Sequence, residues 1–402
     1  MNSTEAFLPV LRFFVCSDTH ISSAQCPNLS KLSNAIDLSY KLSALDKNHP
    51  RLDAVVFVGD ITNRGRAEQF AAFDKLIKAK LKEETTLLAL VATSHDSWDE
   101  GKKSKKYCSE ITGLDSDFYA KLQGFTFIGT STSKYKKERY GLYQHAKLIK
   151  RLKAAANADS QRPIFVFQHE HIKNTVYGSS SFDGWGLNYF KTIYRRYPQI
   201  IHFSGHSHYP LNDPRSIWQG DFTAVGTGAV SYMEFTVDKE RKVHPDNYKN
   251  ANQGWLVEVS ASNSVRLRGL DAINGKVLCE HIIKTPHDKK SFDFTRDKQS
   301  SKAKAPSFAR EASLSITRDN ESIHIDCPAA KIEDNAVVFL YRLTLKDKNG
   351  KIKHSEYKLN DYWLSHTMDE ISFDIKASKG DIVEITAENS YYMPSEVLSA
   401  TI

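Results

Sequence analysis

Five short clusters of histidine and aspartate residues each stand just after an apolar run of strand length. They are Asp18-Thr19-His20, Gly59-Asp60, Ser94-His95-Asp96, His169 and Gly205-His206-Ser207-His208. Side chains two residues apart in an extended backbone point the same way, so Asp18 and His20 could share one cation. Ligands in open α/β sheets gather at the carboxyl ends of strands. Because imidazole and carboxylate groups suit Mn, Fe or Zn, the clusters together predict a metal centre.

Taken singly, each cluster has a simpler explanation than metal binding. An Asp-x-His sequence is often only a polar turn at a strand end, and His169 could be a buried histidine satisfied by its neighbours. His206 and His208 could lie on an exposed strand end. The order of five such clusters along one chain is what favours a shared metal centre.

The elements that must position these clusters alternate along roughly the first 210 residues. Short β-rich runs predict strands, and the segments between them have the apolar spacing of helices. This alternation predicts an α/β layered sheet covered by helices. The predicted strands are residues 13–16, 54–58, 87–91, 125–128, 164–167 and 200–203, and the predicted helices are residues 29–45, 68–82, 143–156 and 188–197.

The pattern changes to strands and turns in the rest of the chain. Strands between residues 216 and 283, with a tight turn at Ile273-Asn274-Gly275, are expected to extend the first domain as a second sheet. We therefore predict a first domain over residues 1–285 and a Lys- and Ser-rich linker over residues 286–306. About seven short strands over residues 307–402 predict a C-terminal all-β sandwich of immunoglobulin or fibronectin type.

Composition limits the compartment and the classes of partner. No apolar run is long enough to cross a bilayer, and the N-terminal residues lack the features of a signal peptide. The five cysteines are scattered without a CxxC pair, which argues against a disulfide framework and favours the cytoplasm. The net charge of +7 comes largely from basic runs such as residues 102–106 and 134–139. These runs indicate solvated loops that attract anionic substrates rather than a specific nucleic-acid surface.

The order of the clusters resembles the calcineurin-like metallophosphoesterase family, whose motifs are DxH, GDxxxxG, GNHD/E, a strand-end His and GHxH. Here they read Asp18-Thr19-His20, Gly59-Asp60-Ile61-Thr62-Asn63-Arg64-Gly65, Thr93-Ser94-His95-Asp96, His169 and Gly205-His206-Ser207-His208. The resemblance spans about residues 10–285 and implies a four-layer fold, a β-sandwich flanked by helices. The C-terminal sandwich is similar, more loosely, to that of some bacterial cyclic-nucleotide-phosphodiesterase-like members.

The resemblance implies a dinuclear centre of Mn, Fe or Zn. One metal ion would be held by Asp18, His20 and His208. The other would be held by His169, His206 and the residue at position 94, and Asp60 would bridge the two ions. A hydroxide bridging the metals would attack the phosphorus atom in line.

Three further residues receive roles from the same resemblance. His95 matches the general acid that protonates the leaving oxygen. Asn63 stands where relatives often have Asp and could orient His95. Arg64 could contact the phosphate group, or its guanidinium could be solvated.

The third motif departs from the family pattern, because the usual Gly-Asn is Thr93-Ser94 in this chain. A serine hydroxyl is a shorter and poorer ligand than a carboxamide oxygen. One interpretation is a tolerated variation in a working enzyme, and the other is a weakened second metal site. Threonine also cannot adopt positive φ as readily as glycine.

The sequence is compatible with three functions. The first is phosphodiester hydrolysis, with a cyclic nucleotide among the candidate substrates, and the second is hydrolysis of a phosphomonoester or pyrophosphate. The third is a catalytically degenerate fold that serves as a binding module. Two insertions, residues 98–119 and 175–185, are expected to overhang the metals. Tyr177, Phe182 and Trp185 could stack on a nucleobase or only pack within their loop. His171 could contact the substrate or be a spare ligand if the strand continues, but it is expected to face solvent.

Overall fold

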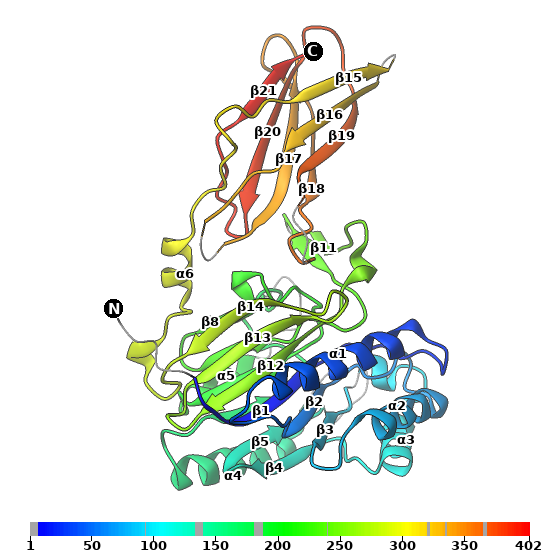
Figure 1. Cartoon of the computed structure of the whole chain (residues 1–402), viewed down its shortest axis with the longest axis vertical. Coiled ribbons are helices and arrows are strands. Elements are labelled where there is room, and N and C mark those ends of the chain that lie inside the picture. Colours follow the sequence, from blue (N-terminus) through cyan, green and yellow to red (C-terminus); the bar gives the residue numbers. More distant parts are fainter. Residues whose placement is uncertain are drawn as a thin grey trace. The chain divides into compact units, whose positions relative to one another are not determined.

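The computed structural model describes residues 7–92, 94–132, 140–180, 188–238, 240–319, 322–333, 336–364 and 368–402. The chain divides into two compact units (Figure 1). The first comprises residues up to Leu211 together with Arg215–Thr295, and the second comprises Asn212–Pro214 and Arg296–Ile402. The predicted linker, residues 286–306, thus spans the boundary at Thr295, and its Phe292 is buried.

The first sheet of the first unit contains the strands that precede the first three clusters. Its strands are β1 (Pro9–Cys16), β2 (Ala54–Val58), β3 (Thr86–Leu90), β12 (Gln253–Ser260), β13 (Val265–Asp271) and β14 (Lys276–Ile283), in the order β14-β13-β12-β1-β2-β3. β1 and β2 are parallel, as are β2 and β3, whereas β12 is antiparallel to β1. The prediction that the late strands build a second sheet is therefore wrong for β12 to β14.

The second sheet carries the strands before His169 and His206. It consists of β4 (Phe118–Leu122), β5 (Phe125–Gly129), β6 (Ile164–Phe167), β7 (Ile200–Ser204), β8 (Ile217–Gln219) and β9 (Thr223–Gly226), in the order β4-β5-β6-β7-β9-β8. One apolar core joins the inner faces of the two sheets. In it the ring of Phe13 lies 4.9 Å from the rings of both Phe127 and Phe165.

Helices cover the outer faces of both sheets. Helices α1 (Pro27–Ala44) and α2 (Ala67–Lys80) pack on the first sheet, and α4 (Leu142–Ala158) and α5 (Asn188–Tyr194) pack on the second. Pro27 occupies the first turn of α1, where its missing N–H costs nothing. The resulting helix–sheet–sheet–helix layering confirms the predicted four-layer α/β fold (Figure 1).

The insertion at residues 98–119 contains a helix, and its position over the metals stays a prediction. Residues 102–112 form helix α3 (Lys102–Thr112), which ends at Gly113 in the left-handed conformation. Cys108 on this helix is buried against Phe70 of α2 and Val91. The basic run at residues 102–106 therefore lies on a helix rather than on a loop, and the second basic run, residues 134–139, lies outside the described residues.

Shorter elements lie between or after the main strands and helices of the first unit. They are the single-turn helices η1 (His95–Ser97), η2 (Pro214–Ser216), η3 (Tyr248–Asn250) and η4 (Lys289–Ser291), and the hairpin strands β10 (Phe235–Val237) and β11 (Glu240–Val243). The hairpin and η3 belong to the long connection between β9 and β12.

The second unit contains helix α6 (Arg296–Lys302) and, after it, the predicted all-β domain. It has a three-stranded sheet, β15-β16-β19, and a four-stranded sheet, β18-β17-β20-β21, whose inner faces share one apolar core. Its strands are β15 (Ser315–Asp319), β16 (Ser322–Pro328), β17 (Val338–Lys346), β18 (Ile352–Leu359), β19 (Glu370–Lys376), β20 (Ile382–Asn389) and β21 (Leu398–Thr401). Seven antiparallel strands in two sheets agree with the expected immunoglobulin or fibronectin type.

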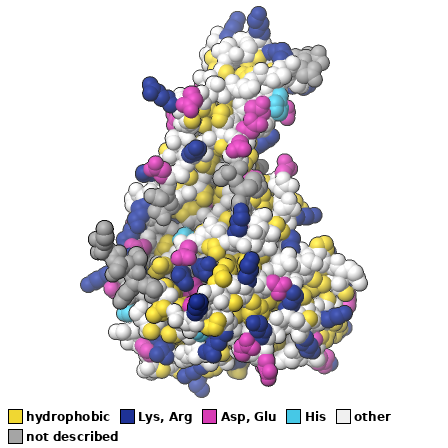
Figure 2. Space-filling model, viewed as in Figure 1, with side chains coloured by type: hydrophobic (Ala, Val, Ile, Leu, Met, Phe, Trp, Pro, Cys, Tyr) yellow, Lys and Arg dark blue, Asp and Glu magenta, His cyan; other side chains and the backbone are white. Residues whose placement is uncertain are grey.

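Charge is mixed over the face shown in Figure 2, where Lys and Arg side chains alternate with Asp and Glu. None of the helices in the described part of the chain is long and apolar enough to span a bilayer. All five cysteines are free thiols. The cytoplasmic location stays a prediction.

Candidate metal centre

The loops that follow β1 and β2 run side by side and bring their polar side chains together. Asp18 N donates to Gly59 O at 3.1 Å, and His20 N donates to Asp60 O at 3.1 Å. Asp18, His20 and Asp60 all have positive φ, at 53°, 46° and 50°. This conformation is uncommon in residues other than glycine and persists where the surrounding structure imposes it, often at functional sites.

The GHxH segment after β7 has the same backbone feature. His206 and His208 have φ of 72° and 56°. Gly205 packs so tightly here that a Cβ atom would come within 2.7 Å of Asp18 Oδ2. Glycine is therefore needed at position 205 for the two loops to meet.

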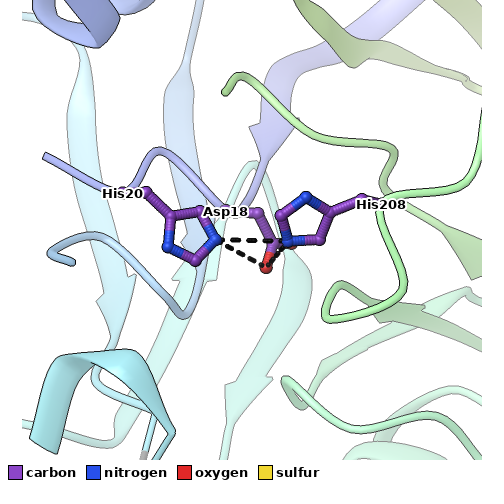
Figure 3. A group of neighbouring side chains, drawn as sticks. All are labelled: Asp18, His20 and His208. Carbon is purple, nitrogen blue, oxygen red and sulfur yellow. Dashed lines mark hydrogen bonds and ion pairs between the residues drawn. The ribbon is translucent and has the colours of Figure 1, made fainter. Parts of the chain in front are cut away.

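The first group of side chains consists of Asp18, His20 and His208, all buried (Figure 3). The Nε2 atoms of His20 and His208 are 3.2 Å apart. Asp18 Oδ1 lies 3.1 Å from Nε2 of His208 and 3.8 Å from Nε2 of His20. Three atoms that can bind a metal thus converge on one point, and they belong to the residues predicted for the first metal.

The second group consists of Asp60, His169 and His206. His169 Nε2 lies 3.2 Å from Asp60 Oδ2 and 3.2 Å from His206 Nδ1. The same Nε2 atom is 3.9 Å from Asp18 Oδ1, so the two groups adjoin. Asp60 also belongs to a group with His20 and His95, which places its carboxylate between the two predicted metal sites.

One buried oxygen shows that these residues fit a cation. Asp18 Oδ1 is buried without a hydrogen-bond partner, while Asp18 Oδ2 accepts a hydrogen bond from His206 N at 3.0 Å. A buried carboxylate oxygen without a partner is costly. The histidine nitrogens around it make a metal ion the fitting partner.

Hydrogen bonds behind the histidines turn the correct ring nitrogen toward the site. His169 Nδ1 lies 2.8 Å from Val58 O, and His208 Nδ1 lies 3.1 Å from Tyr232 O. A carbonyl oxygen can only accept, so each Nδ1 carries a proton and Nε2 is left to bind a metal. A Cβ atom at Gly59 would come within 2.7 Å of His169 Nδ1, which explains the glycine beside Asp60.

Electrostatics favours the charged carboxylates and a neutral His20. Burial raises the pKa of Asp18, but with no metal bound, protonated His208 and His169 outweigh it and hold that pKa below its usual range. Burial acts in the same way on Asp60, and there His169 brings the pKa well below its usual range. Burial lowers the pKa of His20 to about 3, so its ring is neutral at neutral pH.

Ser94 contacts the central carboxylate. Its hydroxyl donates a hydrogen bond to Asp60 Oδ1, and His95 N donates to the same oxygen at 3.1 Å. Ser94 therefore lies at the second group, and its hydroxyl proton is donated to Asp60. A weakened second metal site stays a prediction. Thr93 lies outside the described residues.

We predict that Ser94→Asn increases occupancy of the second metal site and raises turnover severalfold, because a carboxamide oxygen is a better ligand than a hydroxyl. Metal content and kcat measured at limiting Mn²⁺ check this expectation. Ser109→Asn, which changes an exposed serine on α3, is the control. Two tightly bound ions in the unchanged protein, with no gain in Ser94→Asn, would contradict it.

His95 lies beside the first group. Its ring meets the ring of His20 edge-on at 4.3 Å, and its Nδ1 is 3.1 Å from the main-chain oxygen of Asn63. The described contact that orients His95 is thus made by the backbone of Asn63 rather than by the predicted side chain. Nε2 is left as the nitrogen that can reach a substrate.

Arg64 is half-exposed and lies over the ring of Trp98 at 5.3 Å, with Asp99 at 3.5 Å. Trp98 in turn lies 5.0 Å from the His95 ring. Arg64 therefore belongs to the rim beside His95, and its contact with a phosphate stays a prediction.

Two contributors are not assigned from the sequence. Asp96 is fully buried and accepts hydrogen bonds from Thr62 N, Thr62 Oγ1 and Ala92 N at 2.7, 2.9 and 3.0 Å. It ties the second motif to the third, and its place in the GNHD/E pattern was the available signal. Tyr232, whose ring lies 4.3 Å from that of His208, follows no motif that could have indicated it.

In the second insertion, Tyr177 takes the packing role, one of the two that the sequence leaves open. Tyr177 stacks on Tyr209 at 4.0 Å and has Arg215 over its ring at 3.8 Å, so its described role is packing. Phe182 and Trp185 lie outside the described residues. The expectation that His171 faces solvent is wrong: it is buried, with Nδ1 2.8 Å from Ser204 Oγ, because residues 168–172 continue into the core.

Comparisons with known proteins agree with this geometry. Residues 11–210 match the family model described as "Calcineurin-like phosphoesterase". No curated protein sequence matches the chain. The narrower resemblance to cyclic-nucleotide-phosphodiesterase-like members finds no support among the matches and stays a prediction.

Solved structures give distant matches. One is GAP50, the anchor in the inner membrane complex of Plasmodium, at 13% identity and a TM-score of 0.45, covering 68% of this chain and 89% of that chain. Another is the purple acid phosphatase PPD1 from yellow lupin (Lupinus luteus) seeds, at 16% identity and a TM-score of 0.43, covering 68% of this chain and 53% of that chain. The domain that carries the five clusters belongs to the calcineurin-like metallophosphoesterase family, whose model it matches over residues 11–210.

Proposed function

We propose that the chain is a metal-dependent phosphodiester hydrolase with two ions of Mn, Fe or Zn. The observation that carries this proposal is the convergence of two Asp/His groups around the unpartnered Oδ1 of Asp18. Metal ions bound there would supply Lewis-acid chemistry toward a phosphoryl group and toward water. Asp18, His20 and His208 would hold one ion, His169 and His206 would hold the other, and Asp60 would serve both.

The chain's own residues supply positioning and a proton. Hydrogen bonds from Ser94 and from the His95 amide hold Asp60 Oδ1, so the shared carboxylate has a fixed orientation. His95, held through Nδ1 by Asn63 O, donates the proton on Nε2 to the leaving oxygen. Arg64, on the rim, adds positive charge for an anionic substrate.

A diester with a planar organic group, such as a nucleotide, is the substrate class that we favour. Trp98 presents a half-exposed ring beside His95, and Tyr232 lies beside His20 and His208. One aromatic ring beside His95 and another beside His20 and His208 suit a phosphorus atom that carries two organic groups. The partner is thus a small phosphorylated molecule, rather than a membrane or a specific nucleic acid.

A substrate panel tests the proposal. Protein stripped with a chelator and reloaded with Mn²⁺, Fe²⁺ or Zn²⁺ should hydrolyse bis(p-nitrophenyl) phosphate faster than p-nitrophenyl phosphate or pyrophosphate, and the stripped protein should hydrolyse none of them. Cyclic nucleotides, mononucleotides and sugar phosphates then define the natural substrate. Faster hydrolysis of monoesters or pyrophosphate would replace the diesterase assignment. No hydrolysis with any metal would indicate a degenerate fold that serves as a binding module.

A further inference from the structure

Three rings beside the first metal group form a cluster, of which the proposed function uses only Tyr232. Tyr232, His244 and Tyr248 contact one another, with ring centroids 5.9 Å apart for Tyr232 and His244, 5.9 Å for Tyr232 and Tyr248, and 4.4 Å for His244 and Tyr248. We infer that this ring cluster binds the organic group that stays on phosphorus during hydrolysis, and that this group is planar and aromatic. The inference rests on the proposed function.

The position of the ring cluster relative to His95 supports this role. Tyr232 lies 4.3 Å from the ring of His208 and 5.7 Å from that of His20. The leaving group must lie next to His95, which donates its proton, and there the neighbouring ring is Trp98. The second organic group of a diester therefore needs another place, and the ring cluster is the described aromatic surface next to His20 and His208.

The ring cluster is both accessible and preformed. Tyr232 and Tyr248 are half-buried, and the His244 side chain is 36% exposed. The segment is anchored to the metal loops, because Ser231 N donates to Asp18 O at 3.2 Å and Glu234 N donates to His208 O at 3.1 Å. Binding therefore requires little ordering of the protein.

A lysine also holds the segment that carries the three rings. Lys31 Nζ, on α1, donates to the main-chain oxygens of Ser231, Lys249 and Ala251. Met233 N donates to Tyr248 O at 2.9 Å, which joins the two ends of the segment. The three rings thus keep their arrangement without help from a substrate.

The chemistry of the rings selects a planar group over an alkyl group. Aromatic faces stack on nucleobases and on aryl groups. His244 Nε2 lies 3.3 Å from Glu234 Oε1, which leaves Nδ1 for a polar atom on the edge of a bound ring. Lys249 Nζ lies 5.5 Å from the Tyr248 ring and adds positive charge beside an anionic substrate.

Two diesters with the same leaving group test the inference. Bis(p-nitrophenyl) phosphate and methyl p-nitrophenyl phosphate both release p-nitrophenolate and differ only in the group that remains. In Tyr248→Leu and His244→Leu, the ratio of kcat/KM for the aryl diester to that for the methyl diester should fall about tenfold relative to the unchanged protein, mainly through KM. Tyr232→Phe, which keeps the ring, should retain the ratio.

Matched controls make the outcomes distinguishable. Tyr143→Leu removes an exposed tyrosine on α4 and should leave the ratio as it is. An unchanged ratio in Tyr248→Leu would overturn the inference, and so would an equal loss on both diesters accompanied by lost metal, because the rings would then only support the ligands. If the metal-loaded unchanged protein hydrolyses neither diester, the proposed function fails, and the inference with it.

Discussion

Asp60→Asn is expected to abolish hydrolysis of bis(p-nitrophenyl) phosphate, with kcat/KM lower by on the order of a thousandfold. Asp60 lies 3.2 Å from His169 Nε2 through Oδ2 and also forms a group with His20 and His95, so its carboxylate adjoins both predicted metal sites. Loss of residues behind metal ligands typically costs about 10- to 100-fold, and loss of a shared ligand should cost more. Asparagine keeps the shape and removes the charge.

The Asp60 prediction is checked by steady-state kinetics at saturating Mn²⁺ and by metal content after dialysis. Asp37→Asn, an exposed residue on α1 paired with Lys80, is the control and should be fully active. Unfolding followed by circular dichroism separates loss of chemistry from loss of fold. Full activity in Asp60→Asn would remove the dinuclear mechanism.

His95→Gln is expected to lower kcat by about 10²- to 10⁴-fold on diesters with poor leaving groups, and by less on p-nitrophenyl esters. The reason is that a basic leaving oxygen needs a proton in the transition state, whereas p-nitrophenolate departs readily without one. Rates for aryl diesters whose phenols increase in basicity should therefore fall more steeply in the variant than in the unchanged protein.

Two results would show that His95 is not the general acid. An equal loss for every leaving group would mean that His95 positions the substrate without donating a proton. A loss of metal in His95→Gln would make His95 a ligand, which its grouping with His20 and Asp60 allows geometrically. Since the main-chain oxygen of Asn63 holds Nδ1, Asn63→Ala should preserve the leaving-group dependence.

The sequence indicates where the metal centre lies, because the signals are local. Each parallel strand is a short apolar run, and the residue after it must lie at the carboxyl edge of the sheet, as Asp18, Asp60 and His169 do. Positions fixed by contacts distant in sequence were missed. β12 joined the first sheet because it pairs with β1, where buried Arg12 meets Glu258 at 2.7 Å, a pairing that no local pattern contains.

Contacts between residues distant in sequence also decide how Ser94, Asn63 and Tyr232 are placed at the site. The Ser94 hydroxyl had two possible partners, a metal and Asp60, and only the packed structure shows its hydrogen bond to Asp60. Asn63 was expected to act through its side chain, because a motif specifies side chains and not carbonyl directions. The ring cluster lies in the connection between β9 and β12, whose sequence has no helical or strand periodicity. The sequence therefore does not indicate that the ring of Tyr232 contacts that of His208.

Metal binding by the stripped protein tests the central claim most directly. Titration with Mn²⁺ followed by calorimetry and elemental analysis should show two sites per chain, the weaker of them at His169, His206 and Ser94. In Asp18→Asn the stronger site should be lost, because its buried oxygen meets both His20 and His208. Fewer than one ion bound at millimolar Mn²⁺, Fe²⁺ or Zn²⁺, by a folded protein, would contradict a dinuclear metal centre.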